Sequence, residues 1–285
     1  MENNTDNKNT WDSVIQSKSS FFDLRLKELW DYRDLLVLFV RRDFLTVYKQ
    51  TIFGPFWFFI PPILTTITFT IVFGNIAQIP TDGAPKLVFY MAGITIWNYF
   101  STCLINVSGV FNANAGIFGK VYFPRLIMPL TIVISNLLKF FVQYCMFLIF
   151  VFYYYYHNLI QPNFWMLLTP VIILLMALIS MGIGLVLSSM TTKYRDLNML
   201  IGFGIQLLMY ASPVIYPTSS ISNNYGWFLN LNPLVPMFDY MRYAYLGVGT
   251  FDVVSLLYPA CFSMFILIIG MFVFNKVQRT FMDTV

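Results

Sequence analysis

The sequence has few charged residues: they make up 11% of the chain, where an ordinary soluble domain carries about 25%. Hydrophobic residues account for 58% of its 285 positions, and the mean hydropathy is +0.68. A chain of this composition cannot cover its surface with polar groups, so lipid must be its main solvent. The formal net charge of only +4 gives no support to a nucleic-acid-binding function.

The groups on which most enzymes and metal sites depend are also scarce. The single histidine, His157, lies in a polar turn, and the apolar stretches contain no pair of carboxylates for acid–base catalysis. The cysteines Cys103, Cys145 and Cys261 lie in apolar runs without Cys-x-x-Cys spacing, so we expect packing residues and no disulfide framework. The sequence therefore predicts neither an enzyme nor a metal site.

A phosphate-binding loop for ATP is missing as well. The tripeptide Gly119-Lys120-Val121 comes nearest to one, but it lacks the preceding glycine and the Ser or Thr that would bind magnesium. If ATP drives this protein, ATP and Mg²⁺ must bind to another chain, and this chain needs no cofactor of its own.

Long stretches without Asp, Glu, Lys or Arg are abundant instead. Because a spanning helix needs roughly 20 apolar residues, they predict an all-α membrane protein with six transmembrane helices within residues 53–276. We expect these helices near residues 55–74, 88–110, 132–156, 164–189, 198–216 and 254–275. A polar turn with a proline, residues 157–163, divides the longest stretch into two helices.

Lys and Arg residues are concentrated in alternate connections between these helices. They occur before the first helix, in the second and fourth connections, and after the last helix, whereas the other connections hold only Lys86 and Arg242. Since an excess of Lys and Arg marks cytoplasmic loops, both termini are predicted to be cytoplasmic. Residues 1–20 and 277–285 are expected to be polar tails, and the first shows no cleavable signal peptide.

Residues 21–52 mix polar and apolar side chains at helical spacing. They predict one or two amphipathic helices that lie on the inner membrane surface. Such a segment can dock a cytoplasmic partner or anchor the chain to the membrane, and the two interpretations are compatible.

The connection at residues 217–250 is the longest on the predicted outer side, and it is partly apolar. Its apolar runs are interrupted by Pro233 and Pro236 and are too short to span. We expect two short helices that form a re-entrant hairpin in the outer leaflet.

Aromatic residues make up 19% of the chain, and two interpretations of them are open. They can form an interfacial belt, where amphipathic rings favour the headgroup level. They can also line a transport pathway, because aromatic faces bind the C–H faces of sugars weakly and without register. The candidate pathway residues are Trp57, Trp97, Tyr99, Phe100, Tyr210 and Tyr216.

Two features inside the predicted helices also have two interpretations each. Lys139 can extend its ammonium group to the inner interface, or it can face the transport pathway. Ser180, Gly184 and Ser188 are spaced by four, which allows close helix packing either within one subunit or between subunits.

Four segments resemble the permeases of bacterial ABC exporters for lipid-linked polysaccharides, which are of the ABC-2 type. They are residues 48–57 (YKQTIFGPFW) with the motifs at 61–62 and 72–74, residues 120–129 (KVYFPRLIMP), residues 193–196 (KYRD) with 212–217 (SPVIYP), and residues 232–234 (NPL) with Arg242 downstream. In order and together, they cover most of residues 25–250. One mild departure is Phe53, which stands where a leucine is expected before Gly54.

The resemblance implies an ABC-2 exporter fold, a second copy of this chain, and two ATP-binding cassette subunits. It assigns residues 111–128 to a coupling loop that inserts into the ATPase, residues 23–50 to an interface helix, and residues 218–246 to an outer gate. The implied coupling residues are Asn114, Phe118, Lys120, Val121, Tyr122, Phe123 and Arg125, and those of the interface helix are Arg33, Arg41, Arg42 and Lys49. Lys193, Arg195 and Asp196 in the other inner loop either pair locally or meet the partner.

The resemblance also implies a place in the bacterial inner membrane and a polysaccharide linked to undecaprenyl diphosphate, with O-antigen preferred to capsule or teichoic acid. An ABC-2 permease for a lipid or a drug is the alternative within the class, and the motifs at residues 48–57 and 122–129 argue against it. A membrane transferase acting on lipid-linked sugars is the alternative from another class. The lack of acid and base groups in the spans argues against the transferase.

Overall fold

The computed structural model describes residues 26–49, 54–118, 120–194, 196–221 and 226–282. Its regular elements in these ranges are all helices, as the sequence predicted, and no β-strand occurs in them. The tail at residues 1–20, Arg195 and residues 283–285 lie outside the described residues.

Five helical segments are long and apolar enough to cross a membrane. They are Phe56–Ile76, Lys86–Ser108, Ile127–Tyr156, Phe164–Lys193 and Val253–Val277. The first joins η1 (Gly54–Phe58), α3 (Ile60–Phe69) and the π-helix η2 (Thr70–Ile76); the next two are α4 (Lys86–Ser108) and α6 (Ile127–Tyr156). The last two join η3 (Phe164–Leu168) to α7 (Thr169–Lys193), and η6 (Val253–Leu256) to α11 (Leu257–Met282). Five of the six predicted helices are thus present, with boundaries shifted by a few residues.

The sixth predicted helix, residues 198–216, is shorter than expected. It forms α8 (Leu197–Tyr210), which has 14 residues and a length of about 21 Å, less than the roughly 30 Å of a hydrocarbon core. The chain leaves the helix just before Pro213, because a proline disfavours the helical conformation of the residue that precedes it. Residues 211–217 continue as a buried turn instead.

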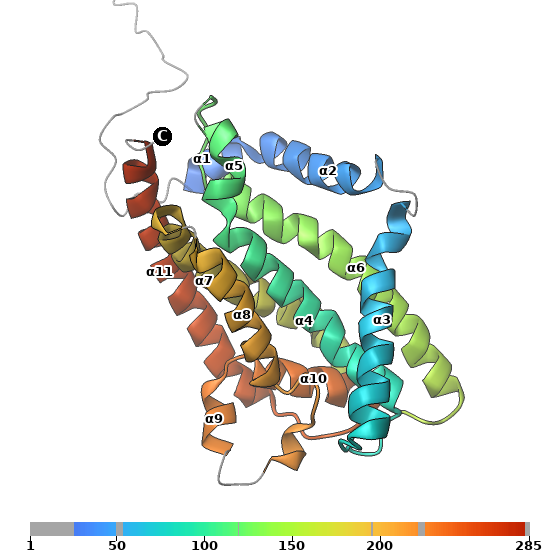
Figure 1. The fold of residues 1–285 in the computed structure, drawn as a ribbon. Coiled ribbons are helices and arrows are strands. Elements are labelled where there is room, and N and C mark those ends of the chain that lie inside the picture. The colour runs from blue at the N-terminus through green and yellow to red at the C-terminus, as the bar shows by residue number, and fades with distance from the viewer. Residues whose placement is uncertain (1–25, 50–53, 119, 195, 222–225, 283–285) are drawn as a thin grey trace, which may run out of the picture.

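The short helices lie at opposite ends of the bundle (Figure 1). At one end are α1 (Leu26–Asp31), α2 (Arg33–Lys49), α5 (Val110–Phe118) and the end of α11. Because this end carries the lysines and arginines of the predicted inner loops, we call it the basic end. At the other end are η4 (Thr218–Ser220), α9 (Gly226–Leu231) and α10 (Val235–Leu246), which define the hairpin end. The described part of the predicted segment 21–52, residues 26–49, forms two helices with a break at Tyr32, and the predicted hairpin contains two short α-helices.

Helix α7 is packed between α4 and α11, and glycines let the three helices come close. A Cβ atom on Gly184 would lie 2.7 Å from the side chain of Val107 on α4, and one on Gly270 of α11 would lie 2.5 Å from the carbonyl oxygen of Gly182. Ser180 and Ser188 are fully buried at the same helix. The row of small residues therefore serves packing within one chain.

The hairpin end is tied to the loop that precedes α7. The backbone N–H of Asn163 donates to Ala244 O (3.0 Å), and its side-chain amide donates to Tyr243 O (2.9 Å). Helix α10 is capped by Gly247, whose φ of +73° suits glycine. A Cβ atom on this residue would lie only 2.6 Å from Gln161 O. This close contact fixes α10 across the ends of the long helices.

Candidate functional site

The predicted coupling loop begins as a helix, α5, and continues as a folded loop. Phe118 and Phe123 are buried, at 4% and 5% exposure, and their ring centroids lie 5.8 Å apart. Phe123 also meets Phe39 of α2 edge to face at 5.9 Å. The Asn114 side chain donates to Val110 O (2.9 Å) within α5. Phe39, Phe118 and Phe123 hold the loop and α2 together from inside. In this structure the rings of Phe118 and Phe123 are therefore not available for the partner contacts that the resemblance implies.

The tip of this loop has the opposite character. Lys120 is exposed, and Val121 and Tyr122 are 58% and 54% exposed. The Arg125 guanidinium lies over the ring of Phe118 at 5.6 Å, and its partial burial lowers its pKa. The tip therefore presents an apolar and basic surface on a rigid aromatic base.

Helix α2 lies against α6 and carries the predicted interface residues. Arg33 and Arg41 are exposed, and the Arg33 guanidinium lies 5.7 Å from the ring of Trp30. Arg42 lies over Phe39 at 4.7 Å. Lys49 is the last residue of α2, and its side chain lies outside the described part. Exposed apolar residues on the same segment, Trp30, Val37 and Leu38, suit a membrane anchor as well as a docking surface.

The second inner loop joins α7 to α8. Lys193 and Asp196 are both exposed, and no ion pair within 4 Å joins these two described residues. The Lys193 ammonium lies 5.1 Å from the ring of Tyr194 instead. Arg195 lies outside the described residues, so local pairing through Arg195 and contact with a partner both stay open for this loop.

The candidate pathway aromatics fall into two groups. Trp97, Tyr99 and Phe100 lie in the middle of α4 and are at most 6% exposed. Trp97 packs on Phe100 (5.6 Å between ring centroids), and Tyr99 packs on Phe140 of α6 (5.4 Å). The rings of these three residues therefore belong to the packed core of the single chain.

The other three candidates are accessible. Trp57 in η1 is 43% exposed and Tyr210 at the end of α8 is 49% exposed. Tyr216 is partly buried, and its hydroxyl donates to Tyr210 O (3.1 Å). Trp57 lies near the basic end and Tyr210 toward the hairpin end, so the two do not share one site.

Arg242 of α10 organises the hairpin end. It is 3% exposed, and its guanidinium donates to three carbonyl oxygens: Tyr216 O at 2.9 Å, Pro213 O at 2.5 Å and Val214 O at 3.3 Å. It also lies 4.1 Å from the ring of Phe89. Burial lowers the pKa of Arg242 to about 10, so the group is still charged at neutral pH. Arg242 thereby clamps the turn that ends α8.

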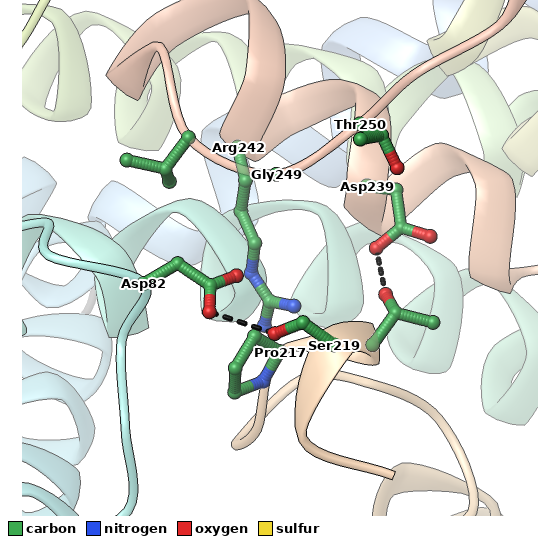
Figure 2. Close-up of a pocket in the computed structure, with 9 residues that line it drawn as sticks. Asp82, Pro217, Ser219, Asp239, Arg242, Gly249 and Thr250 are labelled. Carbon is green, nitrogen blue, oxygen red and sulfur yellow. Dashed lines mark hydrogen bonds between the residues drawn. The ribbon is translucent and has the colours of Figure 1, made fainter. Parts of the chain in front are cut away.

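Two carboxylates face Arg242 across a cavity of about 310 Å³ (Figure 2). Asp239 accepts a short hydrogen bond from Thr218, and Asp82 accepts one from Ser219 (2.7 Å). Burial raises the pKa of Asp239, partly offset by this hydrogen bond and by Arg242. The cluster connects the α3–α4 loop, η4 and α10.

Sequence reasoning placed Arg242 only as part of a family motif and overlooked Asp82 and Asp239. The sequence did contain a signal for a buried charge, because Arg242 is the only lysine or arginine between Arg195 and Lys276. A lone charge in a chain this apolar needs buried partners. Among the described residues, no group of three or more His, Cys, Asp or Glu could hold a metal ion.

Together, the long apolar helices and their exposed apolar faces define a multi-pass membrane protein. The family model described as ABC-2 type transporter matches residues 34–246, from the start of α2 to the end of α10. The chain therefore belongs to the ABC-2 type transporter family.

Relatives align over nearly the whole chain. The O-antigen export system permease protein RfbA of Klebsiella pneumoniae is 28% identical over 252 residues, which cover 88% of this chain and 94% of the relative. A protein of the same name from Myxococcus xanthus is 24% identical over 91% of this chain and 98% of its own length. The polysialic acid transport protein KpsM of Escherichia coli is 24% identical over 85% of this chain and 93% of its own.

Proposed function

We propose that this chain is the permease subunit of an ATP-driven ABC transporter that exports a lipid-linked polysaccharide across the bacterial inner membrane. The alignment with relatives named O-antigen export permeases carries the proposal, because it covers 88% and 91% of this chain and nearly the whole length of each relative. O-antigen is the first substrate class, linked to undecaprenyl diphosphate. The chain itself is not an enzyme.

ATP and Mg²⁺ bind, in this proposal, to two separate ATP-binding cassette subunits, since the sequence has no nucleotide-binding loop. The exposed tip at Lys120, Val121 and Tyr122 supports a contact with such a subunit. The buried Phe118–Phe123 contact makes the tip stiff, so that movement of an ATPase reaches α4 and α6 through a short lever.

The transport pathway is proposed to form between two copies of the chain. The α3 and α8 segments have exposed apolar faces, including Leu64 at 58%, Met199 at 84% and Phe203 at 59%. A second copy can cover such faces and bring Trp57 and Tyr210 to the interface. In this arrangement α8 is the sixth span, both termini are cytoplasmic, and α9 with α10 forms an outer re-entrant gate.

Capsular polysaccharide is the second candidate substrate, favoured by the similarity to the polysialic acid transport protein. Export of a drug or a simple lipid has no comparable support from the relatives that align with this chain. A membrane transferase is disfavoured by the lack of paired carboxylates in the spans.

The test is deletion of the gene in the source bacterium, with surface glycan and lipid-linked glycan measured in parallel. We expect surface polysaccharide to disappear while undecaprenyl-linked polymer accumulates inside, and the wild-type gene to restore export. The structure of the lost polymer separates O-antigen from capsule. Unchanged surface glycan, with no intracellular polymer, contradicts the proposal.

A further inference from the structure

A polar cavity of about 320 Å³ lies at the basic end, between α2, α4 and α6. Its lining comprises Arg42, Asp43 and Thr46 from α2, Asn106 from α4, and Ile132, Ser135, Asn136 and Lys139 from α6. The sequence left the surroundings of Lys139 open, and in the structure Lys139 lines this cavity. Lys139 lies beside the interface helix, where its ammonium group meets other polar groups and not an apolar core.

The cavity carries an excess of positive charge. Arg42 forms an ion pair with Asp43 at 2.8 Å, and both side chains remain partly exposed. The Lys139 ammonium donates to Asn136 Oδ1 (3.0 Å), and no carboxylate of the described chain lies within 4 Å of it. Two cations and one carboxylate leave a net positive charge, which favours an anionic ligand.

A buried hydroxyl in the same cavity lacks a partner. Ser135 is 4% exposed, and its Oγ forms no hydrogen bond with any described residue. Thr131, one turn earlier in α6, donates to Ile127 O at 2.8 Å, as helix hydroxyls commonly do. An unsatisfied buried hydroxyl is destabilising, so a group that accepts its proton is expected in the cavity.

Arg42 is held in place for such a group. Its guanidinium lies over Phe39 at 4.7 Å and uses Nε and one terminal nitrogen for Asp43, which leaves other N–H groups for a ligand. Guanidinium, ammonium and hydroxyl donors that converge on one cavity suit the oxygens of a phosphate group.

The surroundings of the cavity indicate where this phosphate comes from. Ile132 forms an apolar part of the wall, and Leu137, Leu138 and Phe141 of α6 are exposed nearby along the helix. Acyl chains can cover these side chains while a headgroup enters the cavity, and basic pockets between transmembrane helices bind lipid headgroups in this way. We propose that the cavity between α2, α4 and α6 binds the phosphate of a membrane lipid through Lys139, Arg42 and Ser135. This proposal does not depend on the exported substrate.

The test is native mass spectrometry of the purified full-length chain with added lipid. The probes are phosphatidylglycerol, diacylglycerol with the same acyl chains, and undecaprenyl diphosphate. We expect retention of phosphatidylglycerol and little retention of diacylglycerol. Lys139→Met and Arg42→Gln should each weaken phosphate-lipid binding at least tenfold, and Ser135→Ala a few-fold, whereas Lys139→Arg should keep it.

Two further variants make the experiment independent of folding defects. Arg41→Gln removes a neighbouring exposed cation of α2 that does not line the cavity, and it should leave binding unchanged. Asp43→Asn removes the competing carboxylate and should strengthen binding several-fold, a gain that misfolding cannot produce. The proposal is overturned if wild type and Lys139→Met retain both phosphate lipids equally, or if diacylglycerol is retained as well as both phosphate lipids are.

The two phosphate probes separate the possible sources. Lys139-dependent retention of phosphatidylglycerol assigns the site to bulk membrane lipid, and Lys139-dependent retention of undecaprenyl diphosphate alone assigns it to a polyprenyl carrier. Either result upholds a phosphate site. The surface-glycan assay above reports separately on export.

Discussion

The two ends of this protein treat polar groups in different ways. At the hairpin end, Arg242 is 3% exposed and has three backbone carbonyls as partners, and Asp239 and Asp82 each accept a hydrogen bond from a hydroxyl. At the basic end, Arg42 pairs with the carboxylate of Asp43, and Lys139 has only the amide oxygen of Asn136 as its described partner. The first set finds most of its partners within the chain, whereas the second is more exposed and has fewer of them.

This difference separates a structural cluster from a binding surface. A buried polar network whose members are mostly paired with one another rigidifies the elements it connects, here the α3–α4 loop, η4 and α10. Only the Nε of Arg242 lacks a hydrogen-bond partner among the described residues of this cluster. Groups that are left incompletely paired at the basic end stabilise the protein little until something outside the chain contacts them. The hairpin end should therefore respond to mutation through stability, and the basic end through binding.

The largest expected effect comes from Arg242→Leu. It leaves the carbonyls of Pro213, Val214 and Tyr216 without their donor, and hydrogen bonds to a charged group contribute about 1.5–3 kcal/mol each. We expect a loss of roughly 5 kcal/mol of stability, seen as a sharply lower melting temperature and less monodisperse protein by size-exclusion chromatography.

Two variants sharpen this result. Arg242→Lys keeps the charge but cannot reach several carbonyls with a planar fork, so it should recover only part of the stability. Arg41→Leu, at an exposed position of the basic end, should stay within about 0.5 kcal/mol of wild type. A melting temperature for Arg242→Leu equal to that of wild type would break the comparison between the two ends.

The next prediction is that two adjacent residues of the coupling loop, Phe123 and Tyr122, differ in their effects on stability and on ATPase binding. Phe123→Ala removes a buried ring that packs on Phe39 and Phe118, and it should cost about 3 kcal/mol of stability. Tyr122→Ala removes an exposed ring, so stability should change by less than about 0.5 kcal/mol. Capture of the partner ATPase should weaken by roughly tenfold in Tyr122→Ala, because exposed aromatics often dominate interfaces.

Co-purification with the ATPase and thermal unfolding of the permease alone distinguish the two roles. If Tyr122→Ala captures the ATPase as well as wild type does, the loop tip is not the contact surface. If Phe123→Ala is as stable as wild type, its ring does not support the loop.

The sequence predicted the long helices well because their signal is physical and local. Stretches without charge mark where lipid contacts the chain, and Pro and Gly mark where helices end. The exception, α8, ends at Tyr210, shortly before Pro213, and the proline could have been used to predict this. Helices α2 and α5, which belong to the segments predicted as cytoplasmic, lie at the same end of the bundle (Figure 1).

The candidate site was harder to predict, because exposure depends on contacts between distant segments. Trp97, Tyr99 and Phe100 are of the residue types that can line a pathway, but their neighbours on α6 and within α4 bury them. Phe123 and Tyr122 are adjacent aromatics, and Phe123 is the buried one because its ring packs on Phe39 of α2 and on Phe118. Periodicity within one segment contains no information on such contacts.

The smallest expected effect concerns the one carboxyl of the hairpin cluster whose pKa burial raises. Because the folded pKa of Asp239 lies above its usual value of 3.8, the stability it contributes is fully present below that value and is lost as pH rises through the folded pKa. Asp239→Asn keeps an acceptor for Thr218 without the charge. From pH 4 upward, wild type should therefore lose stability relative to Asp239→Asn, by about 1.4 kcal/mol per unit of pKa difference. Melting temperatures across this range measure it, with Asp252→Asn, an exposed carboxylate of the same end, as the control for removal of a negative charge. A difference between wild type and Asp239→Asn that does not vary with pH would mean that the cluster tolerates an ionised Asp239 as readily as water does, and the hairpin end would then be less sealed than its hydrogen bonds indicate.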